Sequence, residues 1–562
     1  MKKILVITII LMSLMSCRDK ILDISPKDRI AEDAVWTDES LIRAYHTALY
    51  NSILHGFNIH MQSKATDEAY CSISWGIGIM QTGTYTADNI TSVSNTDWTG
   101  GGGLYYWNTA YQYIRKINIF LDKMQGDAIT ISDKAELVAE VKFLRAYIYF
   151  LLTERFGGVP IVTDYYDLGT NVTFTRNTYD ECVDFIEKDL SEAMPDLPEK
   201  YATTDANFGR ATQDACKALL SRVLLYAASS LHNPTHDNAK WQKAADAAEA
   251  LLNSGYELYP DYTMLFNQAS GTANSEIIFA RNFTKTNGHQ APMHNLGRRY
   301  GAYGGWWASN GPSQNLVDDY DMINGEPAFI YPGGVKTVNP ASGYNPQNPY
   351  KNRDPRFDAT IIHDSSTYHG DLFEMWIASD ANSWGYDSYK QSGDNPRSNY
   401  ELKKFMPDAS VPLNWQTTYT MPWIIFRLGE IYLNYAEAKF ELGDEPTCRQ
   451  YINLVRGRVG MPPIPATVTG DDLKQRLYNE RRIELAFEEH RFWDVRRWKI
   501  AMDIGNRPIY GMDIIKDVNT GVKNYTPVLL NNRNFEEQMY LLPISSDEVK
   551  RNNGTLLQNP GW

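Results

Sequence analysis

Near the C-terminal end of the chain, residues 472–500 combine a helical spacing of apolar positions with a high density of charge. The apolar positions that recur at intervals of three and four are Leu473, Leu477, Ile483, Ala486 and Phe487. Residues 479–499 contain no Gly or Pro, and this pattern predicts a helix. Phe492, Trp493, Val495 and Trp498 add apolar side chains on the remaining faces. A helix that is apolar on nearly every side is buried, so we predict a central helix inside a helical stack.

The charges of this stretch need partners, because a buried charge persists only when it is paired and hydrogen-bonded. Glu488 with Arg491, and Asp494 with Arg497, have the i,i+3 spacing that allows pairing along one helix. The other charges must reach neighbouring helices or loop backbone. A catalytic cluster of Glu484, Glu488 and His490 is the alternative. It is disfavoured because the H-E-x-x-H spacing is missing and every carboxylate has an arginine close by in sequence.

Helical patterns also occupy residues 37–52, 106–124, 132–156, 179–193, 212–230, 240–253, 424–442 and 447–458. Thr37 and Ser132 are placed to cap two of these helices, and Gly157 with Pro160 ends the helix that Ser132 begins. Small alanines at helical spacing, as in residues 241–252, let helices pack closely, as in tetratricopeptide units. The fold class is therefore mostly α, with roughly nine helices that form about four tetratricopeptide-like pairs.

Two long insertions interrupt this scaffold, at about residues 56–104 and 256–422. They divide it into helical parts at about 37–55, 105–255 and 423–500. Loops of this length are usually functional or disordered. Their many aromatic residues argue against disorder, so we expect the insertions to carry the binding function.

The N-terminus has the pattern of a secretion signal. Lys2 and Lys3 precede an apolar run at residues 4–14, which is too short to span a membrane. The run ends at L-M-S-C, which resembles a bacterial lipobox and predicts a signal peptide at residues 1–16 with a lipid on Cys17. The alternative for Cys17 is a free thiol. Residues 17–36 would form the lipid anchor and tether, and several acyl chains would hold the protein on a membrane that it does not cross.

The composition of the chain limits which classes of partner and cofactor it can have. The formal net charge is -14, which argues against a nucleic-acid partner. There are five cysteines without a C-x-x-C spacing, so we expect no cysteine-based zinc site, and we expect Cys182 and Cys216 to be small buried residues without an obligatory disulfide. Asp318, Asp319 and Asp321 lack EF-hand spacing. We expect no cofactor, no catalytic residue and no metal site.

Several segments resemble the SusD/RagB family of outer-membrane lipoproteins, which bind nutrients, mostly glycans, beside a TonB-dependent transporter. The segment 479–498, N-E-R-R-I-E-L-A-F-E-E-H-R-F-W-D-V-R-R-W, resembles the C-terminal signature of the family. Further matches are F-L-R-A-Y-I-Y-F-L-L-T-E-R-F-G-G-V-P-I-V, P-S-Q-N-L-V-D-D-Y and the D-P-R motif at 354–356. The resemblance implies one SusD-like domain over residues 37–562. It also implies a lipid-anchored position at the cell surface of the outer membrane and a SusC-like transporter as partner.

Tryptophans in polar, Gly-rich surroundings mark the expected ligand site. Trp98 stands among Thr, Asn and Asp, where a core role is poorly explained, and Trp306 and Trp307 are adjacent in a Gly-rich loop. Sugar rings present apolar faces that match an indole, while planar polar side chains discriminate hydroxyls. In the family, glycan sites are aromatic arcs built from the first insertion and the loop before the P-S-Q-N-L-V-D-x-Y segment. The resemblance therefore assigns ligand binding to Trp98, Tyr303, Trp306 and Trp307, and also to Trp75 and Asp67; packing roles are the alternative for each Trp.

Other side chains leave the nature of the ligand open. Arg298 and Arg299 could pair bidentately with a sugar carboxylate, or they are solvated loop charges. We expect Arg353 and Arg356 to tie loop backbone to the scaffold, and the terminal Trp562 to dock on the body.

The leading hypothesis is a glycan-binding lipoprotein that is not an enzyme and that delivers oligosaccharides or polysaccharides to its transporter. A helical glycoside hydrolase or lyase is an alternative, because carboxylates are abundant, yet no particular pair stands out. Capture of peptides by the same fold is another alternative.

Overall fold

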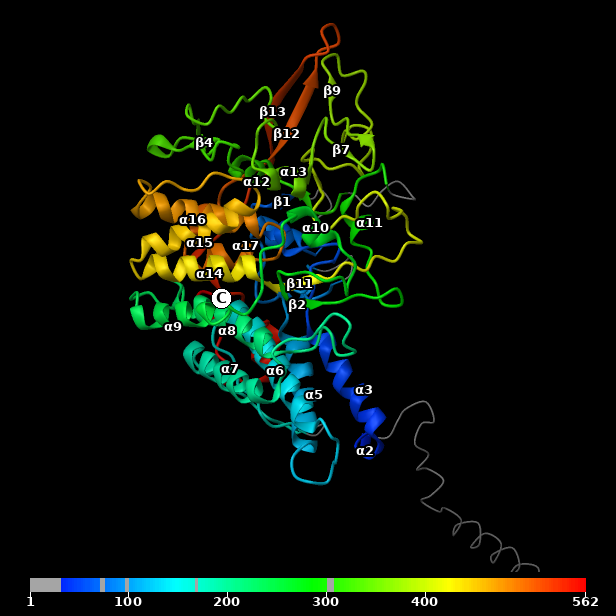
Figure 1. Cartoon of the computed structure of the whole chain (residues 1–562), viewed down its shortest axis with the longest axis vertical. Helices are drawn as coiled ribbons and strands as arrows, with labels where there is room; N and C mark the ends of the chain where they lie inside the picture. The colour runs from blue at the N-terminus through cyan, green and yellow to red at the C-terminus, as the bar shows by residue number, and fades with distance from the viewer. Residues whose placement is uncertain (1–31, 71–75, 97–100, 167–169, 301–307) are drawn as a thin grey trace, which may run out of the picture.

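A stack of helical hairpins forms one side of the molecule, and short elements joined by long loops form the other (Figure 1). The computed structural model describes residues 32–70, 76–96, 101–166, 170–300 and 308–562. Lipidation of Cys17 concerns a residue outside these ranges. None of the described helices is both long and apolar enough to cross a membrane.

The scaffold follows the hydrophobic periodicity of the sequence. Its helices are α3 (Glu39–Leu49), α5 (Trp107–Lys123), α6 (Lys134–Phe156), α7 (Tyr179–Ala193), α8 (Gln213–Ala228), α9 (Asn238–Glu249), α14 (Leu428–Glu441), α15 (Glu445–Arg458) and α16 (Gly470–Glu484). Helix α6 packs on α7, α8 on α9 and α14 on α15, while α9 also contacts α14 and so joins the two parts of the stack across the second insertion. The mostly helical fold class is confirmed. Cys182 and Cys216 are buried, as expected.

Local capping accounts for where several helices begin. Thr178 and Glu181 form a reciprocal capping box at the start of α7, and the Thr212 hydroxyl accepts a hydrogen bond from the Ala215 amide at the start of α8. The prediction for the first long helix was wrong by one residue, because the Asp38 carboxylate accepts from the Ser40 amide at 2.8 Å and takes the capping position expected for Thr37. The start expected at Ser132 is also corrected, because α6 begins at Lys134 and its N-cap residue makes no side-chain capping hydrogen bond.

One predicted helix is partly a strand. Residues 424–427 belong to β11 (Trp423–Arg427), which pairs antiparallel with β2 (Ile277–Arg281), and α14 begins only at Leu428. All five residues of β11 are buried, and aromatic and β-branched side chains suit a buried strand. A short apolar run has the same appearance in a buried strand and a buried helix.

The central helix predicted over 472–500 is two helices. Helix α16 ends at Glu484 and α17 (Arg491–Arg497) follows, with Phe487 and Glu489 between them at positive φ of 62° and 69°. Side chains satisfy carbonyls that the break releases: Tyr262 donates to the Glu484 oxygen at 2.7 Å, and Lys404 donates to the Ala486 oxygen at 2.9 Å. The chain therefore leaves the helix where long-range donors replace helical ones.

Charged side chains of α16, α17 and the break reach almost every neighbouring part of the fold. Glu484 accepts from Arg458 at 2.5 Å, from Arg427 at 2.7 Å and from Arg356 at 3.0 Å, and the side chains of all three arginines are at most 2% exposed. The Asp494–Arg497 pair forms within α17 at 2.9 Å, as predicted. The Glu488–Arg491 pair does not form. Glu488 binds Arg427 and Lys404 instead, because the break turns it away from α17.

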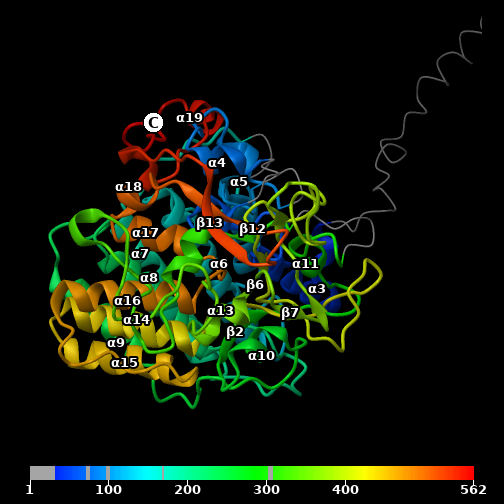
Figure 2. The ribbon, with the colours of Figure 1, turned by 90° about the horizontal axis from the view of Figure 1, so that it is seen from above.

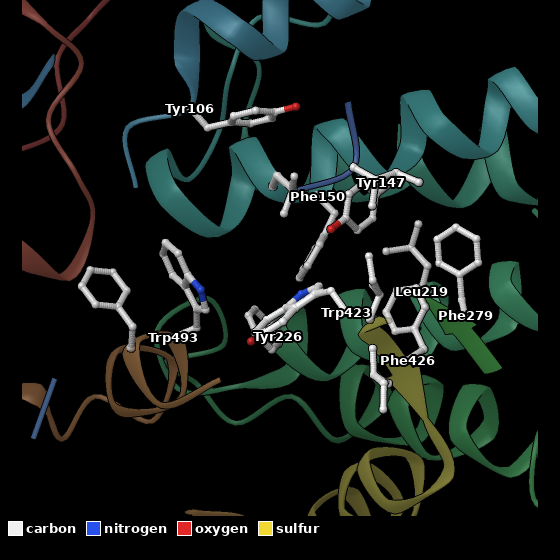
Figure 3. Packing of buried hydrophobic residues seen from close by; sticks show 14 of the residues in the cluster. Tyr106, Tyr147, Phe150, Leu219, Tyr226, Phe279, Trp423, Phe426 and Trp493 are labelled. Atoms are coloured by element: carbon white, nitrogen blue, oxygen red, sulfur yellow. The ribbon is translucent and has the colours of Figure 1, made fainter. Parts of the chain in front are cut away.

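Aromatic side chains fill the core between the scaffold and the β11–β2 pair (Figure 3). Phe150 of α6 meets Tyr226 of α8 with ring centroids 5.4 Å apart, and Phe279 of β2 stacks on Phe426 of β11. Trp562 docks on the body as expected, and its indole donates to the Gln538 and Leu541 carbonyls at 3.0 and 3.1 Å. Arg356 reaches the scaffold, where it binds Glu480 of α16. The expectation for Arg353 is corrected, because its guanidinium donates to the carbonyls of Pro349 and Tyr320, which lie in the same insertion.

The insertions contain many short elements. In the first are η3 (Gln62–Ala65), β1 (Ala69–Tyr70), α4 (Gly78–Thr82) and η4 (Ile90–Val93). In the second are β2, α10 (Tyr262–Asn267), α11 (Ala291–Asn295), β3 (Gly311–Pro312), α12 (Gln314–Asp319) and α13 (Pro355–Thr360), with short strands between and after them. A hairpin of β12 (Ile509–Lys516) and β13 (Lys523–Asn531), which sequence analysis did not predict, projects from the loop-rich side (Figure 1).

Candidate ligand-binding site

The aromatic residues assigned to the ligand site belong to segments that flank the described residues. Trp75, Trp98, Tyr303, Trp306 and Trp307 lie outside the described residues. The structure does define the points at which these segments leave the fold. Those points are Tyr70, Gly76, Thr96, Gly101, Tyr300 and Ala308.

Tyr70 lies on strand β1, and Ala308 lies shortly before strand β3. Strands β1 and β3 are antiparallel, with Ala69 opposite Pro312 and Tyr70 opposite Gly311. Strand β1 leads directly into the segment with Trp75, and β3 follows closely on the segment with Trp306 and Trp307. Parts of the chain that are more than 200 residues apart in sequence are therefore held side by side.

A buried polar hub at residues 59–64 joins these roots. The Met61 amide donates to Asn310 Oδ1 at 3.0 Å, and Asn310 Nδ2 donates to the Ile59 oxygen at 3.2 Å. Ser309 Oγ donates to the same oxygen at 2.7 Å and accepts from Lys64 Nζ at 2.8 Å. Because each of these side chains is buried, a shift in one root leaves a polar group of another unsatisfied.

The root of the segment that carries Trp98 contacts the same hub. Gly102 has a φ of +66°, and a Cβ at this position would lie 2.2 Å from the His60 carbonyl oxygen. The Gly103 amide donates to the Asn95 carbonyl at 3.3 Å and closes the segment at its base. The glycine run thus allows close approach of two backbones, which a side chain would prevent.

Asp67 lies beneath these roots and is fully engaged by the protein. Its carboxylate accepts from Arg491 at 2.9 and 3.0 Å and forms a further ion pair with Arg482. Burial alone raises the pKa of Asp67, but the charges of Arg482 and Arg491 outweigh it and hold the pKa well below its usual range. Ser313 Oγ also donates to the Asp67 carbonyl at 2.6 Å. The geometry gives Asp67 a position that supports these roots, and its assignment as a ligand contact stays a prediction.

The two arginines before the Gly-rich loop differ in their partners. Arg299 forms a bidentate pair with Asp387 at 2.7 and 2.8 Å and lies over the ring of Tyr386. The positive charge of Arg299 is therefore compensated by a carboxylate of the fold itself. Arg298 also lies over Tyr386, and it forms no ion pair within the described part of the chain. Only Arg298 keeps the role of a candidate contact for an anionic sugar.

Two buried glutamates without full charge compensation lie next to the hub and to β1. Burial raises the pKa of Glu489 to about 8 and that of Glu68 to about 8. Glu489 accepts a hydrogen bond from the Gln62 amide at 2.9 Å, at the start of η3. Burial therefore favours the protonated form of both carboxyl groups.

We predict that the fold loses stability as the pH rises from about 5 to 9. The pKa of Glu489 is raised on folding, so the folded chain holds a proton that the unfolded chain has already lost above its usual pKa, and stability is fully present only below that value. Glu489→Gln keeps the acceptor for Gln62 and removes the titration. We expect it to raise the free energy of unfolding by about 1–3 kcal/mol at pH 8.5 and to change it little at pH 5. Urea unfolding at both pH values measures this, and an equal effect at both would contradict it.

Comparison with family models identifies the chain. A model described as the SusD family matches residues 275–562, and a model described as "Starch-binding associating with outer membrane" matches residues 20–225. The chain belongs to the SusD family. The first match alone covers half of the chain and includes the charged signature, β3 and the hairpin.

Relatives and solved structures agree with this membership along the whole length. SusD-like protein P25 of Formosa agariphila is 26% identical over 540 residues, which cover 90% of this chain and 91% of that protein. A SusD-like protein of Bacteroides fragilis has a TM-score of 0.75 at 28% identity and covers 96% of this chain and 100% of its own. A SusD-like carbohydrate binding protein, also from Bacteroides fragilis, has a TM-score of 0.72 at 26% identity, with coverage of 92% and 99%.

Proposed function

We propose that this SusD family protein captures a glycan at the outer surface of the outer membrane. The site is an aromatic arc of Trp98, Tyr303, Trp306 and Trp307, to which Trp75 adds a further ring. The observation that supports it best is the shared root: β1, β3 and the hub at 59–64 bring together the ends of the segments that carry these aromatics. Rings from separate segments with a common base can stack on successive sugars of one chain.

The protein is a binding protein in this proposal, and it makes or breaks no bond. The buried acidic side chains of the C-terminal signature are held by arginines, so they serve packing of the fold. No group of metal-ligating side chains gathers within the described ranges. Stacking of a few sugar units gives micromolar affinity, on the order of -8 kcal/mol.

A lipid on Cys17 anchors the protein, and a TonB-dependent SusC-like transporter receives the glycan. Several acyl chains provide stable attachment to the outer membrane, and residues 17–36 serve as the tether. Support for this location comes from the family model whose description names starch binding and the outer membrane. The aromatic arc would hold the captured glycan against the open transporter.

Calorimetric titration of the chain from residue 18 onward tests the proposal, since the described fold begins at Glu32 and is fully retained. The titrants are neutral polysaccharides and uronate-containing ones. Trp306→Ala and Trp98→Ala are each expected to weaken binding of the recognised glycan at least about tenfold, the loss of about 1.4 kcal/mol of stacking. Trp384→Ala is the control, because Trp384 is 39% exposed and is not assigned to the arc, and it should leave binding unchanged.

The outcomes separate the alternatives. Binding that persists in both arc variants would keep the function and refute the site. If the folded protein binds no glycan but binds peptides, its ligand is a peptide. Appearance of new reducing ends during incubation would show an enzyme.

A further inference from the structure

A pocket of about 440 Å³ opens between α5 and α19 (Ser546–Arg551), and none of the root points of the aromatic arc lines it. Its floor is apolar, with Trp107 and Leu556 almost fully buried. Tyr111, Tyr165, Tyr166 and Phe174 add further rings to its walls. Figure 2 shows α19 close to α5 at the same edge of the molecule. Pockets of about 300–1,000 Å³ that combine aromatic walls with a few polar groups are typical small-ligand sites.

The pocket is preformed, because hydrogen bonds fix the walls to the helices. Tyr111 donates to the Pro160 carbonyl at 2.8 Å, and Arg115 donates to the Tyr166 carbonyl at 3.2 Å. On the other side, the Phe174 amide donates to Asn552 Oδ1 at 3.0 Å, next to α19. A site whose walls are already ordered spends little conformational entropy on binding.

Free polar groups lie beside the rings. Asn108 and Gln112 are one turn apart on α5 and exposed, and within the described ranges their side chains have no hydrogen-bond partner. Each amide can both donate to and accept from a hydroxyl. Side chains at i and i+4 lie on the same face of a helix, so the two amides form a row next to Tyr111.

The charge of the lining balances. Arg115 and Arg551 contribute two positive charges, while Asp164 and Glu548 contribute two negative ones. A uronate or a phosphate would therefore find no net attraction. A ligand with apolar faces and many neutral hydroxyls matches the rings, the free amides and the balanced charge.

We infer that this pocket binds a second segment of neutral saccharide, separate from the aromatic arc. The inference rests on the proposed capture of glycans. The exposed ring of Tyr166, which is T-shaped to Phe174 at 5.9 Å, covers one sugar face, and Asn108 and Gln112 bind its hydroxyls. Two sites on one protein raise the apparent affinity for a long polysaccharide over that for a short oligosaccharide, because the second contact is intramolecular.

The test titrates the chain from residue 18 onward with maltotriose, laminaritriose and a uronate trisaccharide. A neutral trisaccharide should occupy two sites per chain in the intact protein. One site should remain after the double substitution Tyr166→Ala, Gln112→Ala, and one after Trp98→Ala, Trp306→Ala. Apparent affinity for the matching polysaccharide should fall about tenfold with the pocket substitutions.

Controls separate the possible failures. Tyr331→Ala removes another exposed tyrosine, 49% exposed, and should change neither the number of sites nor the affinity. The pocket side chains replaced here are exposed, so circular dichroism should show an unchanged fold. If the intact chain has one saccharide site and the pocket substitutions do not affect it, the pocket does not bind saccharide, and the proposed function still stands. Preference of the pocket for the uronate trisaccharide would overturn its neutral specificity. No binding of any probe by the intact chain would overturn the proposed function itself.

Discussion

Replacing Glu484 with glutamine should lower the free energy of unfolding by about 3–5 kcal/mol, the largest effect that we expect from one substitution. The Glu484 side chain is completely buried and compensates Arg356, Arg427 and Arg458 at 2.5–3.0 Å. Burial raises the pKa of Glu484, but the three guanidinium charges outweigh it and hold the pKa well below its usual range. A glutamine of the same shape would leave these arginines with one negative charge fewer in a medium that water does not reach.

A matched surface pair provides the control for this prediction. Glu192 accepts from Lys142 at 2.8 Å, but its side chain is 42% exposed, and an exposed ion pair contributes about 0–1 kcal/mol. Urea unfolding of Glu484→Gln and Glu192→Gln should therefore differ by several kcal/mol although both remove one carboxylate. If both variants unfold at the same urea concentration as the natural chain, the buried network does not hold the signature in place. The prediction is also supported if Glu484→Gln yields no folded protein while Glu192→Gln folds normally.

The helical scaffold was predictable because its signal is local. Helices α7 and α8 begin at Tyr179 and Gln213, each preceded by a threonine that caps it. The strand at 424–427 was not predictable in the same way, since its identity depends on pairing with β2, about 145 residues earlier. The break after Glu484 has the same origin. Donors from Tyr262 and Lys404, both distant in sequence, stabilise backbone that a local pattern assigns to a helix.

For the candidate site, the sequence reveals the aromatic side chains that could bind a ligand, but not the contacts that hold their segments in place. Tryptophans in polar, Gly-rich segments are visible without a structure. The hub that roots those segments is not, because Asn310 meets Met61 across 249 residues and neither belongs to a motif. The pocket between α5 and α19 was missed for a related reason. Asn108 and Gln112 look like an ordinary solvated helix face until Tyr166 and Phe174 are placed opposite them.

Substitution of Asp67 with asparagine distinguishes a support beneath the site from a ligand contact. Asparagine keeps the size of the side chain and removes its charge. Arg491 then loses its only carboxylate partner among the described residues, and Arg482 keeps only Asp319, at 3.1 Å. We expect the free energy of unfolding to fall by about 3 kcal/mol, because breaking a buried pair leaves an uncompensated charge. Glycan affinity should fall with it, since the Asp67 carbonyl and β1 hold the β3 root in register.

Asp319→Asn is the matched control, because Asp319 pairs with the same Arg482 while its side chain is 31% exposed. It should cost less than about 1 kcal/mol and leave binding intact. The decisive comparison is between stability, from urea unfolding, and affinity, from calorimetry. If Asp67 supports the site without touching the ligand, Asp67→Asn should lower both the stability of the fold and the affinity for the glycan. A direct ligand contact loses affinity at unchanged stability, and that result would return Asp67 to the binding surface and require one of its arginines to release it when the glycan binds.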